Sequence, residues 1–308
     1  MIDITLLGTA ALMPLPERAL TAATLVCSGR AILFDCGEGT QTAARRARVS
    51  LMRADVIALT HCHGDHIFGL PGLLQTMSVM GRTQPLYVIG PGGVREALAP
   101  VVTLAGALGY ELRLMEMPED GVRMAGLAPG WPREAMLSAF PTEHRVRSQG
   151  YCFTLGRSGR FLPERAAALG VPVEQWSRLQ RGEAVRLGDA TIAPEQVLGA
   201  PRRGLKFVIT GDTAPCERIV AAARDADLLI SEATYGEDEL AQAANEHGHM
   251  VFSQAARIAR DAGVRRLWLA HYSQLVENPQ DYLENARAFF PGTVCGSDGM
   301  AVTLKFEE

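Results

Sequence analysis

The sequence predicts an α/β fold, a four-layer αββα sandwich in which two mixed β-sheets pack face to face and helices cover both outer surfaces. Two observations predict it. Short apolar runs bounded by Gly, Pro and Ser alternate with helix-like segments along the chain. The alternation falls into two β-rich halves with helices of their own, and no repeat of about 20–50 residues indicates a solenoid.

In the first half, three consecutive strands open the chain. The runs "ITLLG", "ATLVCS" and "AILFDCG" predict strands at residues 4–8, 23–28 and 31–37. A helix and a buried strand are expected next, at residues 38–49 and 55–61. The alternation then repeats with a strand at residues 85–90 and a helix at 92–106.

The second half shows the same alternation. Strands are expected at residues 205–212, 227–235 and 264–273. Helices are expected at residues 216–226 and 252–263. The chain closes with a predicted helix at 279–290 and a strand at 300–306.

One region interrupts this pattern. Residues 156–204 are rich in Gly, Pro and Arg and have weak apolar periodicity. The region is either a surface insertion or an arm that grips a partner, and the sequence does not decide between the two. We therefore expect a single domain over residues 1–308, with an inserted arm at about 156–204.

Composition excludes several classes of protein. The net charge of −4 gives no molecule-wide basic field, so any nucleic-acid site has to be a local basic patch. No apolar run reaches the roughly 18 residues that span a bilayer, so no membrane partner is expected. The six cysteines lack C-x-x-C spacing, which is typical of reduced thiols in the cytoplasm, and we expect a cytoplasmic protein.

The segment "LTHCHGDHIFGLPGLLQ" holds three of the chain's 7 histidines. His61 and His63 are two residues apart, so in an extended strand both imidazoles face the same side. Gly64 permits a sharp turn that would bring Asp65 and His66 back over the strand end. Two ligand pairs this close suit two divalent ions at roughly 3.5–4 Å, a spacing that polarises a bridging hydroxide.

Further ligands are expected where other apolar strands end. His144 follows one such strand, His271 ends another, and Asp212 ends a third and has two oxygens that can bridge two ions. Each alone also fits a hydrogen-bonded structural residue, and the combination favours a metal site. Imidazole and carboxylate ligands without thiolate favour Zn²⁺, with Mn²⁺ as the alternative.

A longer set of motifs is similar to one enzyme family. The segments "LGTAALMP", "FDCGEGTQ", "LTHCHGDHIFGLPGLL", "HRVRSQGY", "GDT", "SEATY" and "GHMVFSQAARIARDAGVRRLWLAHYS" resemble the ribonuclease Z family of the metallo-β-lactamase superfamily. The match runs along nearly the whole chain. The resemblance implies the metallo-β-lactamase fold and a metal-dependent endoribonuclease that removes 3′ trailers from precursor tRNA and leaves a 3′-hydroxyl.

The resemblance also implies roles for single residues. One of two Zn²⁺ ions per subunit would be held by His61, His63 and His144, and the other by Asp65, His66 and His271. Asp212 would bridge the ions, Asp65 would also orient or deprotonate the attacking water, and His249 matches the family's further catalytic histidine. A homodimer is implied as well, in which the arm of one subunit serves the site of the other.

Two further expectations concern residues around such a site. Glu232 would either accept a hydrogen bond from an imidazole of the site or be an ordinary strand-end carboxylate. RNA phosphates need basic partners, and the candidates in the arm are Arg157, Arg160, Arg202 and Arg203. Phe161 and Trp176 lie in the same stretch and could pack or stack.

Two other functions remain open at this point. The chain reads "PERALTA" and "GVPVEQWSRLQRGE" where the family often has an Arg-Asn pair and a Pro-Gly-Pro-like element. A hydrolase of small phosphodiesters, other small esters or thioesters, without tRNA specificity, is therefore the alternative activity. A binding module on a degenerate sandwich is the other alternative, although seven potential ligands favour an enzyme.

Overall fold

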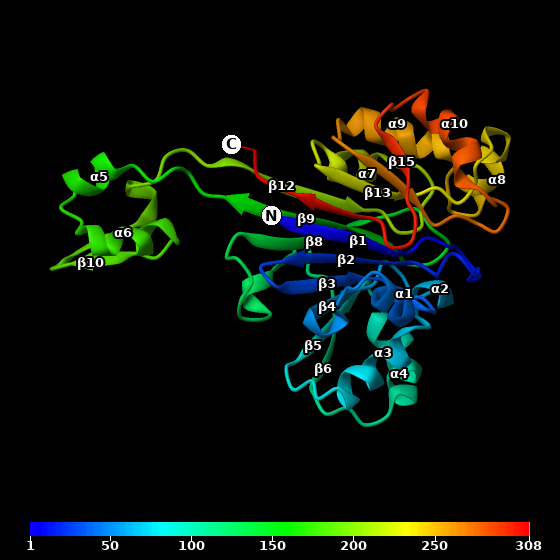
Figure 1. Cartoon of the computed structure of the whole chain (residues 1–308), viewed down its shortest axis with the longest axis horizontal. Coiled ribbons are helices and arrows are strands. Elements are labelled where there is room, and N and C mark those ends of the chain that lie inside the picture. Colours follow the sequence, from blue (N-terminus) through cyan, green and yellow to red (C-terminus); the bar gives the residue numbers. More distant parts are fainter. Residues whose placement is uncertain (308) are drawn as a thin grey trace. The chain divides into compact units, whose positions relative to one another are not determined.

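The computed structural model describes residues 1–307, which form two compact units (Figure 1). The main unit contains residues 1–154 and 205–305. The small unit contains residues 155–204 together with residues 306 and 307. No helix among residues 1–307 is long and apolar enough to cross a membrane.

The first sheet of the main unit has seven strands in the order β16-β1-β2-β3-β4-β5-β6. Pairing is antiparallel from β16 to β3 and parallel from β3 to β6. Its strands are β1 (Ile2–Gly8), β2 (Ala22–Cys27), β3 (Arg30–Phe34), β4 (Ala54–Ala58), β5 (Leu86–Gly90), β6 (Leu112–Glu116) and β16 (Ala301–Leu304).

The second sheet also has seven strands, in the order β15-β14-β13-β12-β9-β8-β7. Strands β12 to β15 are parallel to one another, and β7 pairs antiparallel with β8. Its strands are β7 (Val122–Arg123), β8 (Ala135–Pro141), β9 (Gln149–Arg157), β12 (Arg202–Ile209), β13 (Leu228–Glu232), β14 (Leu267–Ala270) and β15 (Thr293–Cys295).

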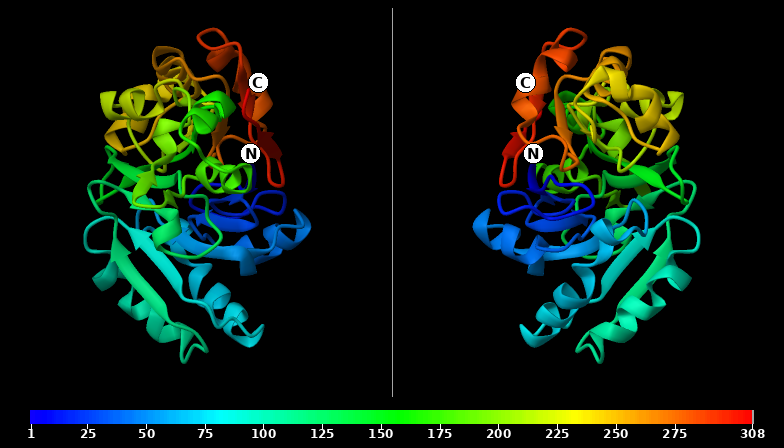
Figure 2. Two further views of the ribbon diagram at one scale, coloured as in Figure 1. Left: turned by 90° about the vertical axis from the view of Figure 1, so that its left-hand side faces the viewer. Right: turned by 90° about the vertical axis from the view of Figure 1, so that its right-hand side faces the viewer.

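Helices cover the outer face of each sheet (Figures 1 and 2). On the first sheet lie α1 (Thr40–Arg46), α2 (Gly64–Ile67), α3 (Leu70–Val79) and α4 (Val94–Ala105). On the second lie α7 (Glu217–Ala223), α9 (Phe252–Ala262) and α10 (Leu283–Arg287), and α8 (Ala241–Glu246) precedes α9. Short 3₁₀ turns occur at Leu51–Arg53, Met124–Gly126, Asp238–Leu240 and Pro279–Tyr282.

Large buried side chains join the two sheets. The ring of Phe34 on β3 lies 5.8 Å from the ring of Tyr151 on β9 and 5.5 Å from that of Phe207 on β12. All three side chains are buried. Two sheets packed through their inner faces, with helices outside, confirm the predicted four-layer α/β sandwich.

Several predicted elements differ from the structure at their ends. The strand predicted at residues 55–61 ends at Ala58, so His61 lies in the loop beyond it. The helix predicted at 38–49 is shorter, and the one at 279–290 is a 3₁₀ turn followed by α10. Helices α3 and α8 and the strands β6, β7, β9 and β15 were not expected. Apolar periodicity marks the stretches that are buried, whereas helix and strand ends are set by backbone hydrogen bonds.

The small unit has its own elements and a small core. It contains α5 (Pro163–Ala168), α6 (Val173–Gln180), β10 (Val185–Leu187), β11 (Ala190–Ile192) and a 3₁₀ turn at Pro194–Gln196. Its core is built from Ala166, Val171, Leu179, Val185, Ile192 and Val197. The rings of Phe161 and Trp176 pack against this core 5.2 Å apart. A single domain with an inserted arm stays a prediction.

Candidate metal centre

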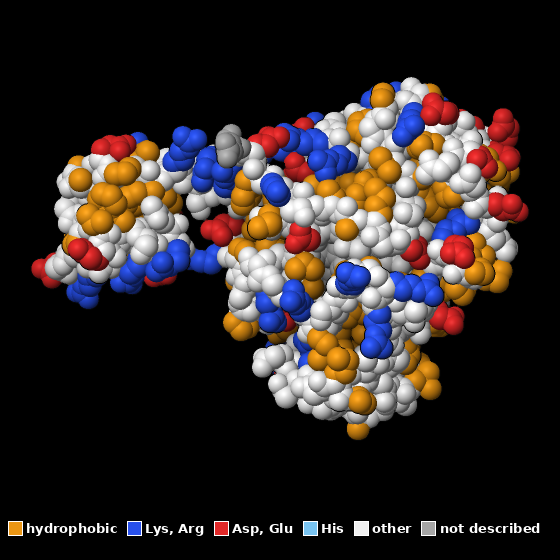
Figure 3. Space-filling view, in the orientation of Figure 1, with side chains coloured by type: hydrophobic (Ala, Val, Ile, Leu, Met, Phe, Trp, Pro, Cys, Tyr) orange, Lys and Arg blue, Asp and Glu red, His pale blue; other side chains and the backbone are white. Residues whose placement is uncertain are grey.

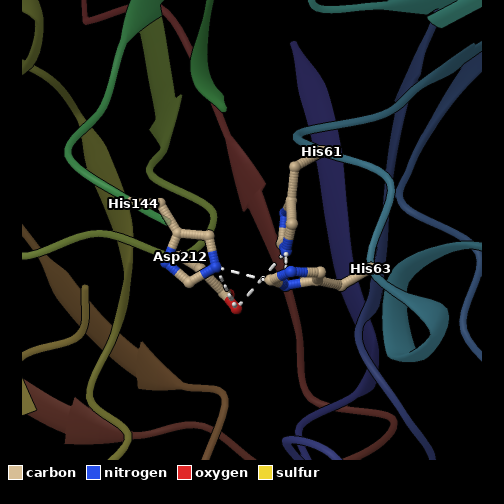
Figure 4. Close-up of side chains that lie close together, drawn as sticks. All are labelled: His61, His63, His144 and Asp212. Carbon is tan, nitrogen blue, oxygen red and sulfur yellow. Dashed lines mark hydrogen bonds and ion pairs between the residues drawn. The ribbon is translucent and has the colours of Figure 1, made fainter. Parts of the chain in front are cut away.

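Three imidazoles and one carboxylate converge at the edge of the main unit's sandwich. His61 and His63 from one loop, and His144 and Asp212 from two others, point toward one another, as Figure 4 shows. The Nδ1 atom of His63 lies 2.9 Å from Nε2 of His61 and 3.2 Å from Nε2 of His144. The Oδ2 atom of Asp212 lies 3.6 Å from Nε2 of His61.

A second cluster shares Asp212 with the first. Its other members are Asp65, His66 and His271, and all four residues are buried. The Nε2 atoms of His66 and His271 face each other at 3.3 Å. Oδ1 of Asp212 lies 3.3 Å from the first of them and 3.2 Å from the second. The structure thus brings together all seven side chains that the sequence singled out as potential ligands.

The backbone path to these residues differs from the expected one. His61 and His63 do not lie on a strand; His63 is the extended residue that precedes helix α2. The first turn of α2, rather than a sharp glycine turn, presents Asp65 and His66. A Cβ atom at Gly64 would lie 2.3 Å from the ring of Phe68, so a larger residue there would displace that exposed ring.

The donor set fits a pair of divalent cations. Oδ1 of Asp212 is buried and has no hydrogen-bond partner among the described residues, while its Oδ2 faces the other cluster. Ligands at about 2.1 Å from a tetrahedral Zn²⁺ would be about 3.4 Å apart, close to the separations of these side-chain atoms. One shared carboxylate between two imidazole-rich clusters is an arrangement that suits a two-metal site.

The ring nitrogens that face away from the clusters also have the hydrogen-bond partners expected of metal-binding histidines. Nδ1 of His66 donates to the buried carboxylate of Asp35 at 2.8 Å. The Thr60 hydroxyl donates to the same carboxylate at 2.9 Å and lies 3.1 Å from Nδ1 of His61. Histidines that bind metals usually donate their other ring N–H to a carboxylate or carbonyl, which fixes the ring. Asp35 therefore orients two imidazoles, one directly and one through Thr60.

Asp35 is a supporting residue of the candidate site that sequence reasoning missed. It ends the run "AILFDCG", and this strand-end position is the signal that singled out Asp212. The backbone at Asp35 has a φ of 54°, in the left-handed region where few non-glycine residues are found. Strained residues of this kind cluster at functional sites.

Glu232 supports residues of the site rather than joining them as a ligand. Its Oε1 accepts from the Thr213 amide at 2.9 Å and from Nδ1 of His249 at 2.9 Å. Its Oε2 accepts from Thr234, at the amide and the hydroxyl, and from the Met250 amide. Both oxygens are thus occupied by donors, so the group formed by Glu232, His249 and His271 does not suit a third ion.

His249 lies at the open side of the clusters. Its side chain is 12% exposed, and its ring stacks on that of His271 with centroids 5.6 Å apart. Burial alone would lower the pKa of His249, but the adjacent Glu232 carboxylate outweighs it and raises the pKa to about 9. His247, by contrast, is exposed and uses its Nδ1 on the Ala243 carbonyl.

Asp65 is held by a backbone donor from another part of the chain. The Leu12 amide donates to Oδ2 of Asp65 at 2.9 Å. Burial opposes the charged form, yet the hydrogen bond with His271 and the charge of His66 lower the pKa of Asp65. The carboxylate is therefore ionised at neutral pH and fixed in orientation.

Gly248 is a second residue that the sequence did not single out for this site. Its carbonyl accepts from Nδ1 of His144 at 2.8 Å, and a Cβ atom there would lie 2.7 Å from the same nitrogen. Its φ is 76°, a conformation that favours glycine.

We therefore expect Gly248→Ala to displace His144 and weaken metal binding about 10- to 100-fold, as loss of a supporting contact does in other metal sites. Competition with a chelator would measure the affinity. Gly170→Ala is the matched control, since Gly170 also has positive φ but no atom near its Cβ position. Equal affinity for both variants would contradict the role of Gly248.

The four arginines expected to bind substrate lie in the two segments, near residues 157–160 and 202–203, that join the small unit to the rest of the chain. The guanidinium of Arg157 packs over the Phe306 ring and donates to the Glu307 carbonyl. Nε of Arg202 donates to the Ser158 carbonyl at 3.0 Å. Arg160 and Arg203 are exposed. Figure 3 shows Lys and Arg side chains (blue) along the edges of this unit.

Comparisons with known proteins agree with this site. Residues 18–89 match the profile of the Metallo-beta-lactamase superfamily, and residues 162–272 match that of the Beta-lactamase superfamily domain. The chain is 40% identical over 310 residues to "Ribonuclease Z" of Lachnoclostridium phytofermentans, covering 100% of this chain and 99% of the relative. It is 39% identical over 310 residues to "Ribonuclease Z" of Lachnospira eligens, with the same coverage.

Solved structures show the same fold. Human tRNase Z, short form, matches with a TM-score of 0.68 and 27% identity, over 99% of this chain and 100% of that one. The metallo-beta-lactamase fold protein YhfI from Bacillus subtilis matches with a TM-score of 0.68 and 20% identity, over 98% of each chain. With full-length relatives at this identity and His/Asp clusters that suit a metal site, the chain belongs to the ribonuclease Z family of the metallo-β-lactamase superfamily.

Proposed function

We propose that this metal-dependent hydrolase removes 3′ trailers from precursor tRNA as an endoribonuclease and leaves a tRNA 3′-hydroxyl. The observation that carries the proposal is the Asp212 carboxylate shared between two imidazole-rich clusters. The relatives named "Ribonuclease Z" and the likeness to human tRNase Z support RNA as the substrate.

Two Zn²⁺ ions per chain fit the donor set best, with Mn²⁺ as the alternative. His61, His63 and His144 would hold one ion, Asp65, His66 and His271 would hold the other, and Asp212 would contact both. Two such cations supply a water nucleophile at neutral pH and neutralise the charge of the phosphate.

Asp65 and His249 would carry the proton transfers. Asp65, ionised and held by the Leu12 amide, orients the attacking water and accepts its proton. The water oxygen forms a bond to phosphorus as the bond from phosphorus to the tRNA O3′ breaks. His249, kept protonated by Glu232, gives its proton to that O3′ and so produces the 3′-hydroxyl.

This role predicts a shift in pH dependence. Because Glu232 raises the pKa of His249 to about 9, the imidazolium persists at neutral pH and is lost as the pH rises through that value. In Glu232→Gln, burial without the carboxylate lowers the pKa, so the alkaline decline of kcat should begin at least about one pH unit lower. Bound cations lower the pKa in both proteins and leave the direction of the difference unchanged. An unmoved alkaline limb would count against His249 as the acid.

The substrate is tested by two reactions in parallel. Wild-type protein is given a 3′-extended tRNA precursor or bis-p-nitrophenyl phosphate, and both should be hydrolysed. Cleavage of the ester alone, with tRNA well above micromolar concentration, would refute the tRNA assignment and leave a small-ester hydrolase. Sequencing the RNA ends checks that the tRNA product carries the 3′-hydroxyl.

The small unit offers a separate test of the arm hypothesis. The two chain segments that enter and leave this unit are hydrogen-bonded to each other. Phe161 forms a β-bridge with Leu198, and the Leu162 amide donates to the Val197 carbonyl at 2.8 Å. A short Gly-rich turn between Leu162 and Val197 can therefore replace residues 163–196. If the unit is a tRNA-binding arm, this variant loses tRNA cleavage and keeps ester hydrolysis. Equal loss of both activities would make the unit structural.

Substitution of a single arginine tests the same hypothesis without removing the unit. Desolvation lowers the pKa of Arg202, and the positive charges of Arg157 and Arg160 lower it further. Arg160 is exposed and available for a phosphate contact. Arg160→Gln should weaken tRNA binding and reduce its salt dependence by about one counterion.

The homodimer that the family resemblance implies is tested by sedimentation of the full chain.

A further inference from the structure

Among the aromatic residues within residues 1–307, Phe68 alone is exposed. Its side chain is 67% exposed, while every other Phe, Tyr and Trp is buried or half-buried. A single exposed apolar residue is ordinary on a protein surface, so the surroundings of this ring decide what it can do.

The ring lies beside the candidate metal centre. Phe68 directly follows helix α2, whose first turn presents Asp65 and His66. Its ring lies against Gly64, between the two ligand-bearing residues His63 and Asp65, where a Cβ atom would overlap it. The ring is thus held in place on one side and open to solvent on the other.

A second element adds apolar surface next to Asp65. The Leu12 amide donates to the Asp65 carboxylate, while the Leu12 side chain is 69% exposed and that of Met13 is 48% exposed. Leu12 has a φ of 62°, so this loop holds an unfavourable backbone conformation at the site. Two segments that contact Asp65 or its neighbour Gly64 thus carry exposed apolar side chains.

We propose that Phe68 stacks on the base of an RNA nucleotide adjacent to the scissile phosphate. The inference rests on the proposed function, because the metal centre positions a phosphodiester and an RNA phosphodiester has a base on either side. Proteins that bind single-stranded RNA stack unpaired bases on aromatic rings, and every base offers such a face. A fixed ring beside the metal centre holds the strand in register without reading its sequence.

The test combines Phe68 variants with substrates that lack one base. Wild type, Phe68→Ala, Phe68→Leu and Phe68→Trp are compared by kcat/KM on a 3′-extended tRNA precursor. The same precursor is prepared with an abasic nucleotide directly 5′ or directly 3′ of the cleaved bond. Val79→Ala is the control. Val79 is also an exposed apolar residue, at 83%, but it lies at the end of α3.

Phe68→Ala and Phe68→Leu should lower kcat/KM about 5- to 100-fold, the range that stacking of one base is worth, while Phe68→Trp stays within about threefold of wild type. Wild type should suffer the same loss on one of the two abasic substrates. On that substrate Phe68→Ala should cause no further loss, because ring and base act as one pair. Val79→Ala should match wild type.

Several results would overturn the stacking. They are an unchanged kcat/KM for Phe68→Ala, a full additional loss on both abasic substrates, or a change of oligomeric state in Phe68→Ala, which would make the ring a protein contact. A wild-type protein that leaves precursor tRNA intact while it hydrolyses bis-p-nitrophenyl phosphate would instead refute the proposed function.

Discussion

Asp212→Ala is expected to lower the hydrolysis rate at least about a thousandfold, which corresponds to on the order of 4 kcal/mol of transition-state stabilisation. Asp212 is the one side chain that belongs to both candidate clusters, with Oδ2 facing His61 and Oδ1 facing His66 and His271. Its removal deprives both ions of a ligand and of the negative charge between them.

Elemental analysis of the purified variant should show fewer than two ions per chain. Asp212→Asn keeps the size and one oxygen and should retain more metal than Asp212→Ala. Asp120→Ala is the matched control, because Asp120 is exposed and outside the clusters. Two ions per chain in Asp212→Ala, with more than about a tenth of wild-type activity, would contradict the shared site.

His249→Ala is expected to lower kcat for RNA about 10²- to 10⁴-fold, the contribution typical of one general acid. Metal content should stay at the wild-type value, because His249 lies outside the two clusters that share Asp212. This combination distinguishes a proton donor from a ligand. His247→Ala, at the exposed neighbour, should have no effect on either quantity.

The leaving group gives a sharper test of the same role. The ribose alkoxide released from RNA is strongly basic and needs a proton, whereas p-nitrophenolate is a weak base and leaves without one. The loss in His249→Ala should therefore be much larger for RNA than for bis-p-nitrophenyl phosphate. Equal losses on both substrates would show that His249 positions the site instead of protonating the leaving oxygen.

The seven ligand candidates could be predicted because four of them share one short His- and Asp-rich segment and the other three follow apolar runs. The apolar run that ends at Leu59 did not reveal where the strand stops, so the expected strand geometry of His61 and His63 was wrong. Their convergence depends on α2 and on loops from distant parts of the chain. Residue type and spacing were sufficient to identify the ligands, but they did not predict the path of the backbone.

The supporting residues were harder to predict because their roles come from long-range contacts. Asp35 meets His66 across 31 positions, and the Gly248 carbonyl meets His144 across 104. The small unit was difficult for another reason. Its helices and strands are short and its core contains few residues, so the apolar pattern is too weak to reveal a period.

Titration of metal-free protein with Zn²⁺ tests the central claim, that two clusters sharing Asp212 form one dinuclear hydrolytic site. Initial rates of precursor tRNA cleavage are measured against equivalents of Zn²⁺ per chain. The account predicts that activity rises until two equivalents are bound and then stays constant. Full activity at one equivalent, or activity that does not depend on added metal, would contradict it.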